Sequence, residues 1–505
     1  MPSSTVDFTD LQGLVRFGFG SLTESCFLLL KIRNAAAARG WIAEAPVTNA
    51  VELASPPDNA LQVIFTHPGL RAIGLPDNLL AGYSNEFLSG MAGNESRSRR
   101  LGDVGTNAPS TWAWGGTEES TPHLALLLYS KPGGLESWRE EIHGPRWSDA
   151  FDEWDCLSTS DMKSFEPFGF KDGVSQPEID WDRTRDKGPS TYSYTNRTAL
   201  GEFLLGYPNE YGKYTDRPLV ADAAAGSGDL PSAEDVPDSR DLGRNSSYLV
   251  FRQLQQDVPA FWQFLQKASE GDVEDRERLA AAMVGRQRMG EPVVPLLDQP
   301  IEGIAAKDAD TNNFTYLADE TGVGCPLGSH IRRTNPRNAD MPGGATSWPR
   351  RLLRALGFPQ QDLREDTISS ARFHRLLRRG REYGPMLTLE EALQPAPPGE
   401  EVRGIYFLCL GANIARQFEF VQSAWALKAN FDGLTGEVDP LLGPRCPLFG
   451  GQPTDSFSIP QRDLPRRHIT GMPQFVTVRG GAYFVLPSIS ALRYIAGISE
   501  HPPSL

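Results

Sequence analysis

Short apolar runs are the feature of this sequence that most constrains its fold. Five runs of four to seven residues, rich in Leu, Ile, Val or Phe, lie at 26–32, 61–66, 123–129, 405–410 and 475–478. Runs of this length are typical of buried β-strands. They are far shorter than the ~20 residues that a helix needs to cross a bilayer. The chain is therefore predicted to fold around buried strands, with no membrane-spanning segment.

Two other segments, 272–283 and 413–427, have the period of amphipathic helices. In the second segment four apolar residues recur every three or four positions, which places them on one buried face: Ile414, Phe418, Val421 and Trp425. Strands mixed with helices predict an α+β or an α/β fold, and propensity alone does not choose between them.

One polar segment divides the chain. Residues 216–244 are rich in Asp, Ala, Gly, Ser and Pro and have no apolar period, which is typical of a connection. The 505 residues are enough for about two to four domains. We predict an amino-terminal module over 1–215, a connection over 216–244 and a carboxy-terminal module over 245–505.

Charge and composition exclude several classes of protein. The chain has 49 Lys and Arg against 64 Asp and Glu, a net charge of −15, so nucleic acid is not an expected partner. The first residues lack the basic and apolar regions of a secretory signal, which predicts a cytoplasmic protein. We also expect no membrane partner, and a monomer or a homodimer. The five cysteines form no C-x-x-C or C-x-x-C-H motif, which disfavours a disulfide framework, structural zinc and covalently attached haem.

A glycine-rich segment carries the first candidate for chemistry. Gly169 and Gly173 bracket Asp172, so the backbone can turn sharply and present a carboxylate to a bulky ligand. Phe168 and Phe170 would supply apolar walls. The Asp-Gly dipeptide alone more often marks a plain turn between strands.

The second candidate is His330, which only six other histidines in the chain rival. Arg332, Arg333 and Arg337 follow it, and nearby cations disfavour imidazolium, so we expect a neutral ring suited to bind a metal. The arginines would also suit an anion, such as a phosphate or the propionates of a porphyrin. A histidine in a basic, solvated loop is the alternative interpretation.

Both segments resemble those of one family. Residues 168–177 (FGFKDGVSQP) resemble the G-x-x-D-G signature of the dye-decolorising peroxidases, and residues 330–337 (HIRRTNPR) resemble that family's proximal-histidine segment. Six further stretches resemble the family in the same order along the chain: 10–15, 201–210, 247–254, 283–286, 376–380 and 417–422.

The resemblance implies an α+β fold of two ferredoxin-like modules, with antiparallel sheets and peripheral helices, and one non-covalent haem b (iron protoporphyrin IX). His330 matches the iron ligand, and Glu419 matches the carboxylate that accepts from the other ring nitrogen of that ligand. Without the resemblance, Glu419 would be a charge at the rim of its helix. Further haem contacts are expected from Phe170, Gly173, Arg332 and Arg333.

The resemblance also implies the catalytic groups. Asp172 matches the acid-base residue that moves the proton of hydrogen peroxide, and Arg378 matches the arginine that stabilises developing charge. Arg379 competes for the latter role. His374, one helical turn before Arg378, is the rival iron ligand. The 48 positions from His330 to Arg378 indicate an insertion between them.

The implied activity is that of a haem peroxidase. Peroxide would oxidise the haem to a ferryl porphyrin radical, and organic donors such as dyes and phenolics would reduce it again in two one-electron steps. Two hypotheses from other classes stay open. One is a haem-binding or haem-handling protein with incidental activity, and the other is a structural or cargo protein without a cofactor.

Overall fold

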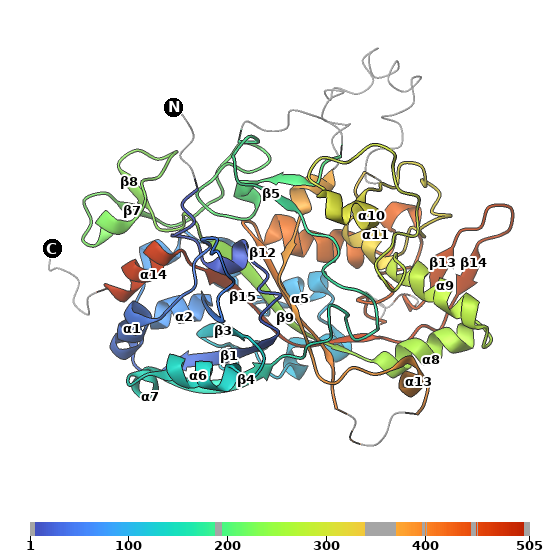
Figure 1. Ribbon diagram of the computed structural model, residues 1–505, viewed down its shortest axis with the longest axis horizontal. Coiled ribbons are helices and arrows are strands. Elements are labelled where there is room, and N and C mark those ends of the chain that lie inside the picture. Colours follow the sequence, from blue (N-terminus) through green and yellow to red (C-terminus); the bar gives the residue numbers. More distant parts are fainter. Residues whose placement is uncertain are drawn as a thin grey trace, which may run out of the picture.

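One antiparallel sheet runs through the computed structural model, which describes residues 6–186, 194–338, 370–395, 399, 401–445, 451 and 453–498 (Figure 1). The sheet has nine strands in the described part of the chain. Across the sheet they are β10 (Leu377–Arg378), β12 (Gly404–Gly411), β9 (Ser247–Gln256), β15 (Val476–Leu486), β2 (Asn59–Phe65), β3 (Leu124–Ser130), β1 (Glu24–Ile32) and β4 (Phe151–Ser158), with β11 (Arg381–Tyr383) also paired to β12.

The two halves of this sheet have the same strand order. Read from the β4 edge, the amino-terminal half runs β4, β1, β3, β2, which are its fourth, first, third and second strands along the chain. Continuing in the same direction, the carboxy-terminal half runs β15, β9, β12 and then β10. With β10 and β11 counted together as the second strand of this half, these are again the fourth, first, third and second along the chain. The halves meet where β15 pairs with β2 through Val485 and Phe65. The chain therefore has an α+β fold with two ferredoxin-like sheets, a duplication that no repeat in the sequence reveals.

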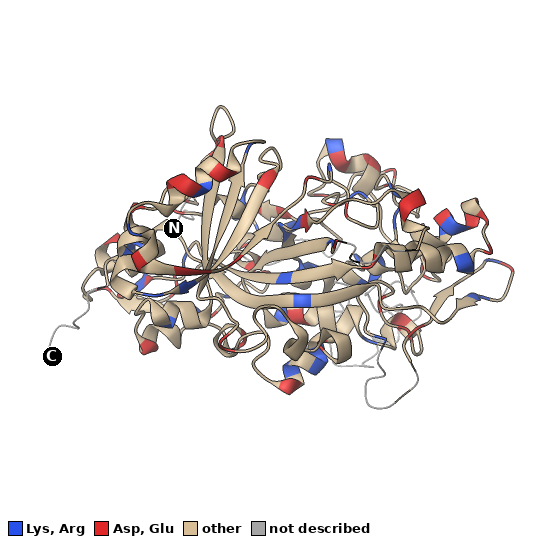
Figure 2. Ribbon diagram, turned by 90° about the horizontal axis from the view of Figure 1, so that it is seen from below, with Lys and Arg blue, Asp and Glu red and all other residues tan. Residues whose placement is uncertain are grey.

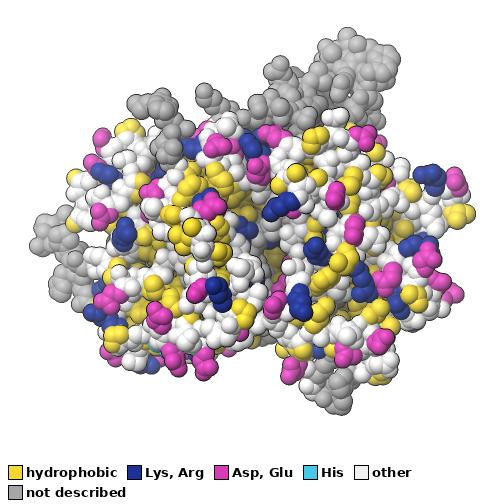
Figure 3. All heavy atoms as spheres, in the orientation of Figure 1, with side chains coloured by type: hydrophobic (Ala, Val, Ile, Leu, Met, Phe, Trp, Pro, Cys, Tyr) yellow, Lys and Arg dark blue, Asp and Glu magenta, His cyan; other side chains and the backbone are white. Residues whose placement is uncertain are grey.

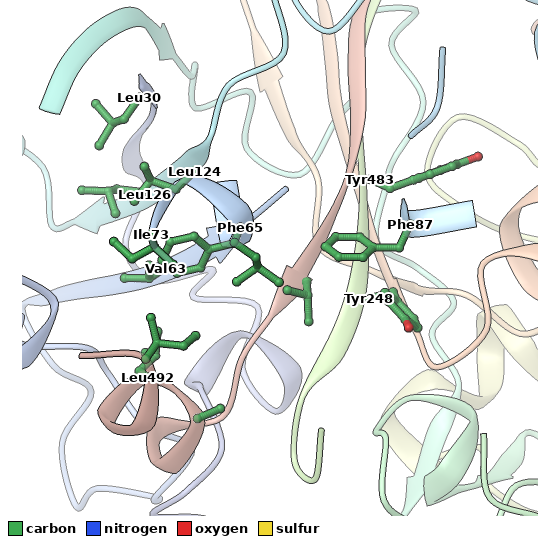
Figure 4. Close-up of a cluster of buried hydrophobic side chains, with 14 of the residues drawn as sticks. Leu30, Val63, Phe65, Ile73, Phe87, Leu124, Leu126, Tyr248, Tyr483 and Leu492 are labelled. Atoms are coloured by element: carbon green, nitrogen blue, oxygen red, sulfur yellow. The ribbon is translucent and has the colours of Figure 1, made fainter. Parts of the chain in front are cut away.

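The five predicted strands are confirmed as β1, β2, β3, β12 and β15. In β1, Leu28 and Leu30 join one buried cluster while Phe27 and Leu29 join the cluster on the other face. Because both faces are covered, residues 26–30 of the strand are continuously apolar instead of alternating. Figure 4 shows part of the first cluster, with side chains from both halves of the sheet.

Strand β15 is longer than its apolar run predicts. It continues through Gly480 and Gly481 to Leu486, and its register against β9 shifts between Val478 and Gly480. A Cβ on Gly480 would lie 2.4 Å from Nε1 of Trp114, so only glycine fits there. Glycines at a bulge hide the second part of the strand from an apolar count.

Helices surround the sheet. In chain order they are α1 (Ala35–Glu44), α2 (His67–Ala72), α3 (Asp77–Leu80), α4 (Asn85–Ser89), α5 (Glu95–Leu101), α6 (Leu135–His143), α7 (Trp147–Ala150), α8 (Val258–Ala268), α9 (Val273–Val284), α10 (Ala309–Asn312), α11 (His330–Thr334), α13 (Leu389–Ala392) and α14 (Ile489–Ala496). The helix predicted over 272–283 is α9, and Asp272 caps it through the backbone N–H of Asp275. Helix α14 returns to pack beside α1 in the amino-terminal half (Figure 1).

The helix predicted over 413–427 is wound more widely than an α-helix. It consists of two π-helical segments, Ala415–Glu419 and Val421–Ala426. The four apolar residues predicted to share a buried face are all less than 10% exposed, which confirms their burial: Ile414, Phe418, Val421 and Trp425.

Small two-stranded sheets form outside the main sheet: β5 (Glu178–Asp180) with β6 (Arg197–Ala199), β7 (Leu219–Ala221) with β8 (Ser239–Asp241), and β13 (Phe457–Ile459) with β14 (Arg467–Ile469). The pair β7–β8 lies within 216–244, and the buried ion pair of Arg217 with Asp241, 2.6 Å apart, supports it. This segment does lie between the two sets of strands, while the module boundaries at its ends stay a prediction.

Charged residues lie mainly on the outer helices and loops and are few on the central strands (Figure 2). On the face drawn in Figure 3, acidic and basic side chains are interspersed. Within the described residues, no helix combines the length and apolarity that a membrane crossing requires.

Candidate active site

A cavity lies against the carboxy-terminal half of the sheet and draws its walls from both halves of the chain. Strands β9, β12 and β15 supply Leu254, Phe407, Val476 and Val478. The glycine-rich segment around Asp172 and the helix α11 that begins at His330 also line it. The two candidate segments, 158 residues apart in the sequence (330 − 172), therefore face one space.

His330 is held by a carboxylate on the side away from the cavity. Its Nδ1 lies 2.8 Å from Oδ2 of Asp439, which is fully buried. The other carboxylate oxygen of Asp439 accepts hydrogen bonds from the backbone N–H groups of Leu441 and Leu442, both 2.9 Å long. The His330 side chain lines the cavity and keeps 25% of its surface exposed. This arrangement leaves Nε2 for a ligand in the cavity.

The electrostatics of His330 differ from the expectation. Burial lowers the pKa of the imidazole, but the Asp439 carboxylate outweighs burial and raises that pKa above its usual value. Burial alone would raise the pKa of Asp439, yet His330 and the backbone donors lower it. The sequence expected Arg332, Arg333 and Arg337 to disfavour the imidazolium form; Arg332 and Arg333 bond elsewhere, and Asp439 is the main group that acts on the pKa of the ring.

Glu419 is not the partner of His330, which corrects the sequence-based assignment. Its Oε1 accepts from Oη of Tyr483 and lies close to Nε of Arg97, each at 2.9 Å, and its Oε2 lies 3.4 Å from Nη2 of Arg100. The π-helical winding turns Glu419 toward α5 and β15. Asp439 takes its place, and no motif around Asp439 signals that role.

Arg332 and Arg333 were also expected at the cofactor, and the structure corrects both. Arg332 donates to Oδ2 of Asp319 at 3.0 Å and to the carbonyl of Cys325 at 2.7 Å. Arg333 donates to the carbonyls of Trp425 and Glu437, at 2.9 and 2.8 Å. Both side chains are about 1% exposed or less, because the turn of α11 directs them into the protein, where they hold neighbouring loops.

Arginines other than Arg332 and Arg333 line the cavity. Those that line it are Arg252, Arg286, Arg337, Arg375 and Arg378, together with Lys171. The lining acids are Asp103, which pairs with Arg252, and Asp172. Burial and the neighbouring Arg337 lower the pKa of Arg286 to about 10, so it stays charged at neutral pH. The cavity is thus cationic in a chain of net charge −15.

Asp172 and Arg378 meet in the cavity. Nη1 of Arg378 lies 3.5 Å from Oδ1 of Asp172, and both side chains are 38% exposed. Nη2 of Arg378 donates to the carbonyl of Ser175 at 2.9 Å. The backbone N–H of Asp172 donates to the carbonyl of Ser164 at 2.9 Å. Positive φ angles of 90° at Gly169 and 70° at Gly173 allow the sharp turns around this carboxylate.

Phe170 and Gly173 do not line this cavity. The Phe170 ring is 4% exposed and lies parallel to Trp262 with centroids 6.5 Å apart, so it packs into the core below α8. Gly173 borders an adjoining pocket beside residues 303–308. The expectation that Phe170 and Gly173 contact the cofactor is therefore corrected. Both residues instead belong to the turn that carries Asp172.

The choice between Arg378 and Arg379 follows from strand geometry. Residues 376–380 form no helix; Leu377 and Arg378 form β10, so consecutive side chains point to opposite faces. Arg379 accordingly turns away from the cavity and donates to the carbonyls of Leu14 and Val15, at 2.7 and 2.8 Å. Residues 339–369, where the predicted insertion falls, lie outside the described residues.

His374 lines the same cavity but has a different environment from His330. It ends the short helix Ser370–His374, and no helix continues from it to Arg378. Its Nδ1 bonds to the carbonyl of Arg416, and its ring stacks on Phe420 with centroids 3.7 Å apart. Burial lowers its pKa to about 4. Among the residues that the structure describes, no carboxylate bonds to this ring as Asp439 bonds to His330.

These residues fit haem. Within the described part of the chain, no group of three or more His, Cys, Asp or Glu side chains could hold a metal ion. A porphyrin brings most of the donors of its iron itself, so it needs few ligands from the protein, and Nε2 of His330 can supply one. Apolar side chains from the sheet suit the ring system, and the arginines suit its propionates.

Comparison with known proteins gives consistent relatives. No model of a known protein family matches the chain. The chain is 30% identical over 527 residues to Peroxidase 2 of Mycetinis scorodonius, covering 97% of this chain and 87% of that protein. It is 28% identical to dye-decolorizing peroxidase AauDyP1 of Auricularia auricula-judae, with the same coverage of 97% and 87%. It is 29% identical to the multifunctional dye peroxidase DyP2 of Amycolatopsis sp., over 80% of this chain and 76% of that one.

Solved structures agree. A double variant of the dye-decolorizing peroxidase of Auricularia auricula-judae matches with a TM-score of 0.70 at 24% identity, covering 98% of this chain and all of that one. An ancestral D-type dye decolorizing peroxidase matches with a TM-score of 0.68 at 26% identity, covering 97% and 99%. The predicted α+β fold is thereby confirmed.

Proposed function

This chain belongs to the dye-decolorising peroxidase family, and from that membership we propose how its own residues carry out the peroxidase reaction. The protein is a haem-dependent peroxidase. We assign iron binding to Nε2 of His330, proton transfer to Asp172 and charge stabilisation to Arg378. The observation that carries this assignment is that all three side chains line one cationic cavity.

When bound, the haem supplies the redox chemistry: it takes two oxidising equivalents from peroxide and passes them on one electron at a time. The carboxylate of Asp172 removes a proton from one oxygen of hydrogen peroxide and returns it to the departing oxygen, which leaves as water. Arg378 lies beside that carboxylate and stabilises negative charge on the peroxide oxygens as the O–O bond breaks. The carbonyl of Ser175 keeps the guanidinium in place.

Asp439 acts through His330. Its buried carboxylate holds the ring in one orientation and increases the basicity of the ligand nitrogen. Arg286, Arg337 and Arg375 supply positive charge for the propionates.

The electron donors are organic molecules. A relative's structure contains 2,6-dimethoxyphenol, and other relatives are named for dyes, so we propose phenols and dyes as donors here. The net charge of −15 disfavours sulfonated dyes as physiological donors. Oligomeric state and a cytoplasmic location stay predictions.

The test is an absorption spectrum of the purified protein before and after one equivalent of peroxide, for the wild type and for Asp172→Asn. The wild type should show a haem band that shifts on addition of peroxide. The variant should keep the resting band and lose about 10²- to 10⁴-fold in the rate of the peroxide step. Unchanged turnover in Asp172→Asn would remove the assigned role of this residue.

A further inference from the structure

Two cysteines on neighbouring strands lie outside the haem cavity. Cys26 of β1 is paired with Ser158 of β4, and Leu28 is paired with Cys156, so the two cysteines are diagonal neighbours on one face of the sheet. Both are free thiols. Cys26 is 2% exposed, whereas Cys156 is only half-buried.

A bulge in β4 brings charge to this thiol pair. Leu29 pairs with Asp155 but Leu30 pairs with Glu153, so one residue of β4 is left without a partner. The extra residue reverses the alternation of side chains and places Glu153 on the same face as Cys156. The bulge therefore puts a carboxylate and a thiol side by side.

Arg139 of α6 bridges these two groups. Its Nη2 lies 2.5 Å from Oε2 of Glu153, and its Nη1 lies 3.7 Å from Sγ of Cys156. Glu153 is held in turn by Nε1 of Trp147 at 3.0 Å. A guanidinium fixed beside a partly exposed sulfur favours the thiolate, which is the reactive form of cysteine.

The two thiols are therefore unequal. Interaction with the neighbouring Cys26 thiol, together with the Arg139 guanidinium, lowers the pKa of Cys156 below its usual value, although burial and Glu153 oppose this. The same interaction and burial raise the pKa of Cys26. Of the two, Cys156 is therefore suited to attack an oxidant first, and Cys26 is suited to react afterwards with the oxidised Cys156.

We propose that Cys156 and Cys26 form a peroxide-reactive thiol pair, a second redox site that works independently of the haem. The Cys156 thiolate attacks one oxygen of hydrogen peroxide; an S–O bond forms, the O–O bond breaks, and the released hydroxide takes up a proton to become water. Cys26 then loses its proton and attacks the sulfur of the Cys156 sulfenic acid. The S–S bond forms and the second oxygen leaves as water, so that one peroxide is reduced while two thiols become a disulfide.

The test uses the holoenzyme, first reduced and freed of reductant and then treated with a few equivalents of peroxide. Mass spectrometry of the digest should show the peptides of Cys26 and Cys156 joined, with the loss of two hydrogens. Cys26→Ser should instead trap a sulfenic acid at Cys156, detected as a dimedone adduct, with the haem band and peroxidase rate unchanged. Cys409→Ser, at a site that is 1% exposed, is the matched control and should still form the link.

Two results would overturn the proposal. One is that both thiols stay unmodified at peroxide concentrations that saturate turnover. The other is that the link forms in the wild type but not in Asp172→Asn, because oxidation would then depend on the haem site. Since the readout is a covalent link and not activity, it stays separate from the test of the roles assigned to Asp172 and Arg378.

Discussion

Nδ1 of His330 and Oδ2 of Asp439 lie 2.8 Å apart although 109 positions separate the two residues in the chain. The carboxylate is fully buried, and two backbone N–H groups hold its second oxygen. His330 therefore enters the cavity with one ring nitrogen engaged and the other facing the cofactor site.

Asp439→Asn should lower peroxidase activity about 10- to 100-fold and raise the reduction potential of the bound iron, because an amide accepts the imidazole N–H more weakly than a carboxylate does. Spectroelectrochemistry of the holoenzyme measures the potential. Glu419→Gln is the matched control and should leave the potential unchanged, since Glu419 bonds to Tyr483 and Arg97 instead. A change of potential in Glu419→Gln but not in Asp439→Asn would instead make Glu419 the acceptor of the His330 ring N–H, as the sequence first suggested.

Arg378→Ala should lower kcat/KM for peroxide about 10²- to 10³-fold with the haem band retained, because it removes the cation beside Asp172. Arg379→Ala should leave kcat/KM unchanged and reduce the free energy of unfolding by about 1–3 kcal/mol, since two carbonyls lose their donor. Stopped-flow kinetics and thermal unfolding distinguish the two. Equal kinetic losses in both variants would contradict the assignment of Arg378, and not Arg379, to the cavity.

His374→Phe should keep the haem band of the wild type, because a phenyl ring can still stack on Phe420 and His374 is not the iron ligand. His330→Ala should lose that band. The absorption spectrum after expression with ample haem is the measurement. A band that disappears in His374→Phe and persists in His330→Ala would exchange the two assignments.

Glu166 makes stability depend on pH. Burial raises its pKa from the ordinary 4.5 to about 7, although the backbone N–H groups of Phe170 and Phe168 and the side chain of Gln256 favour the ionised form. Because the folded protein holds this proton more tightly than the unfolded chain, the contribution is complete below pH ~4.5 and is lost as pH rises through about 7. It amounts to up to about 3 kcal/mol. Glu166→Gln should therefore show a smaller fall in melting temperature between pH 4.5 and pH 8 than the wild type, and an identical fall would exclude this source.

Five of the nine strands of the described sheet, and the two segments that carry the site, were predictable, each for a local reason. Leu28 and Phe27 point to opposite faces of β1, yet both are buried, so the run is apolar throughout and identifiable without any partner strand. Gly169 and Gly173 adopt backbone angles that favour glycine, so the turn around Asp172 can be predicted from these two residues alone. The wide winding of the helix at Glu419 has no such local signature.

By itself, the sequence determined five of the nine strands of the described sheet and which residue types stand at His330, Asp172 and Arg378. Only the tertiary structure decided which carboxylate meets His330 and which arginines face the cofactor. Arg333 lies three residues after His330 but points into the protein, whereas Arg375 reaches the cavity from a distant segment. The reason is physical: local backbone preference is encoded over a few residues, but the direction of a side chain and its partner depend on helix and strand phase and on how distant segments pack.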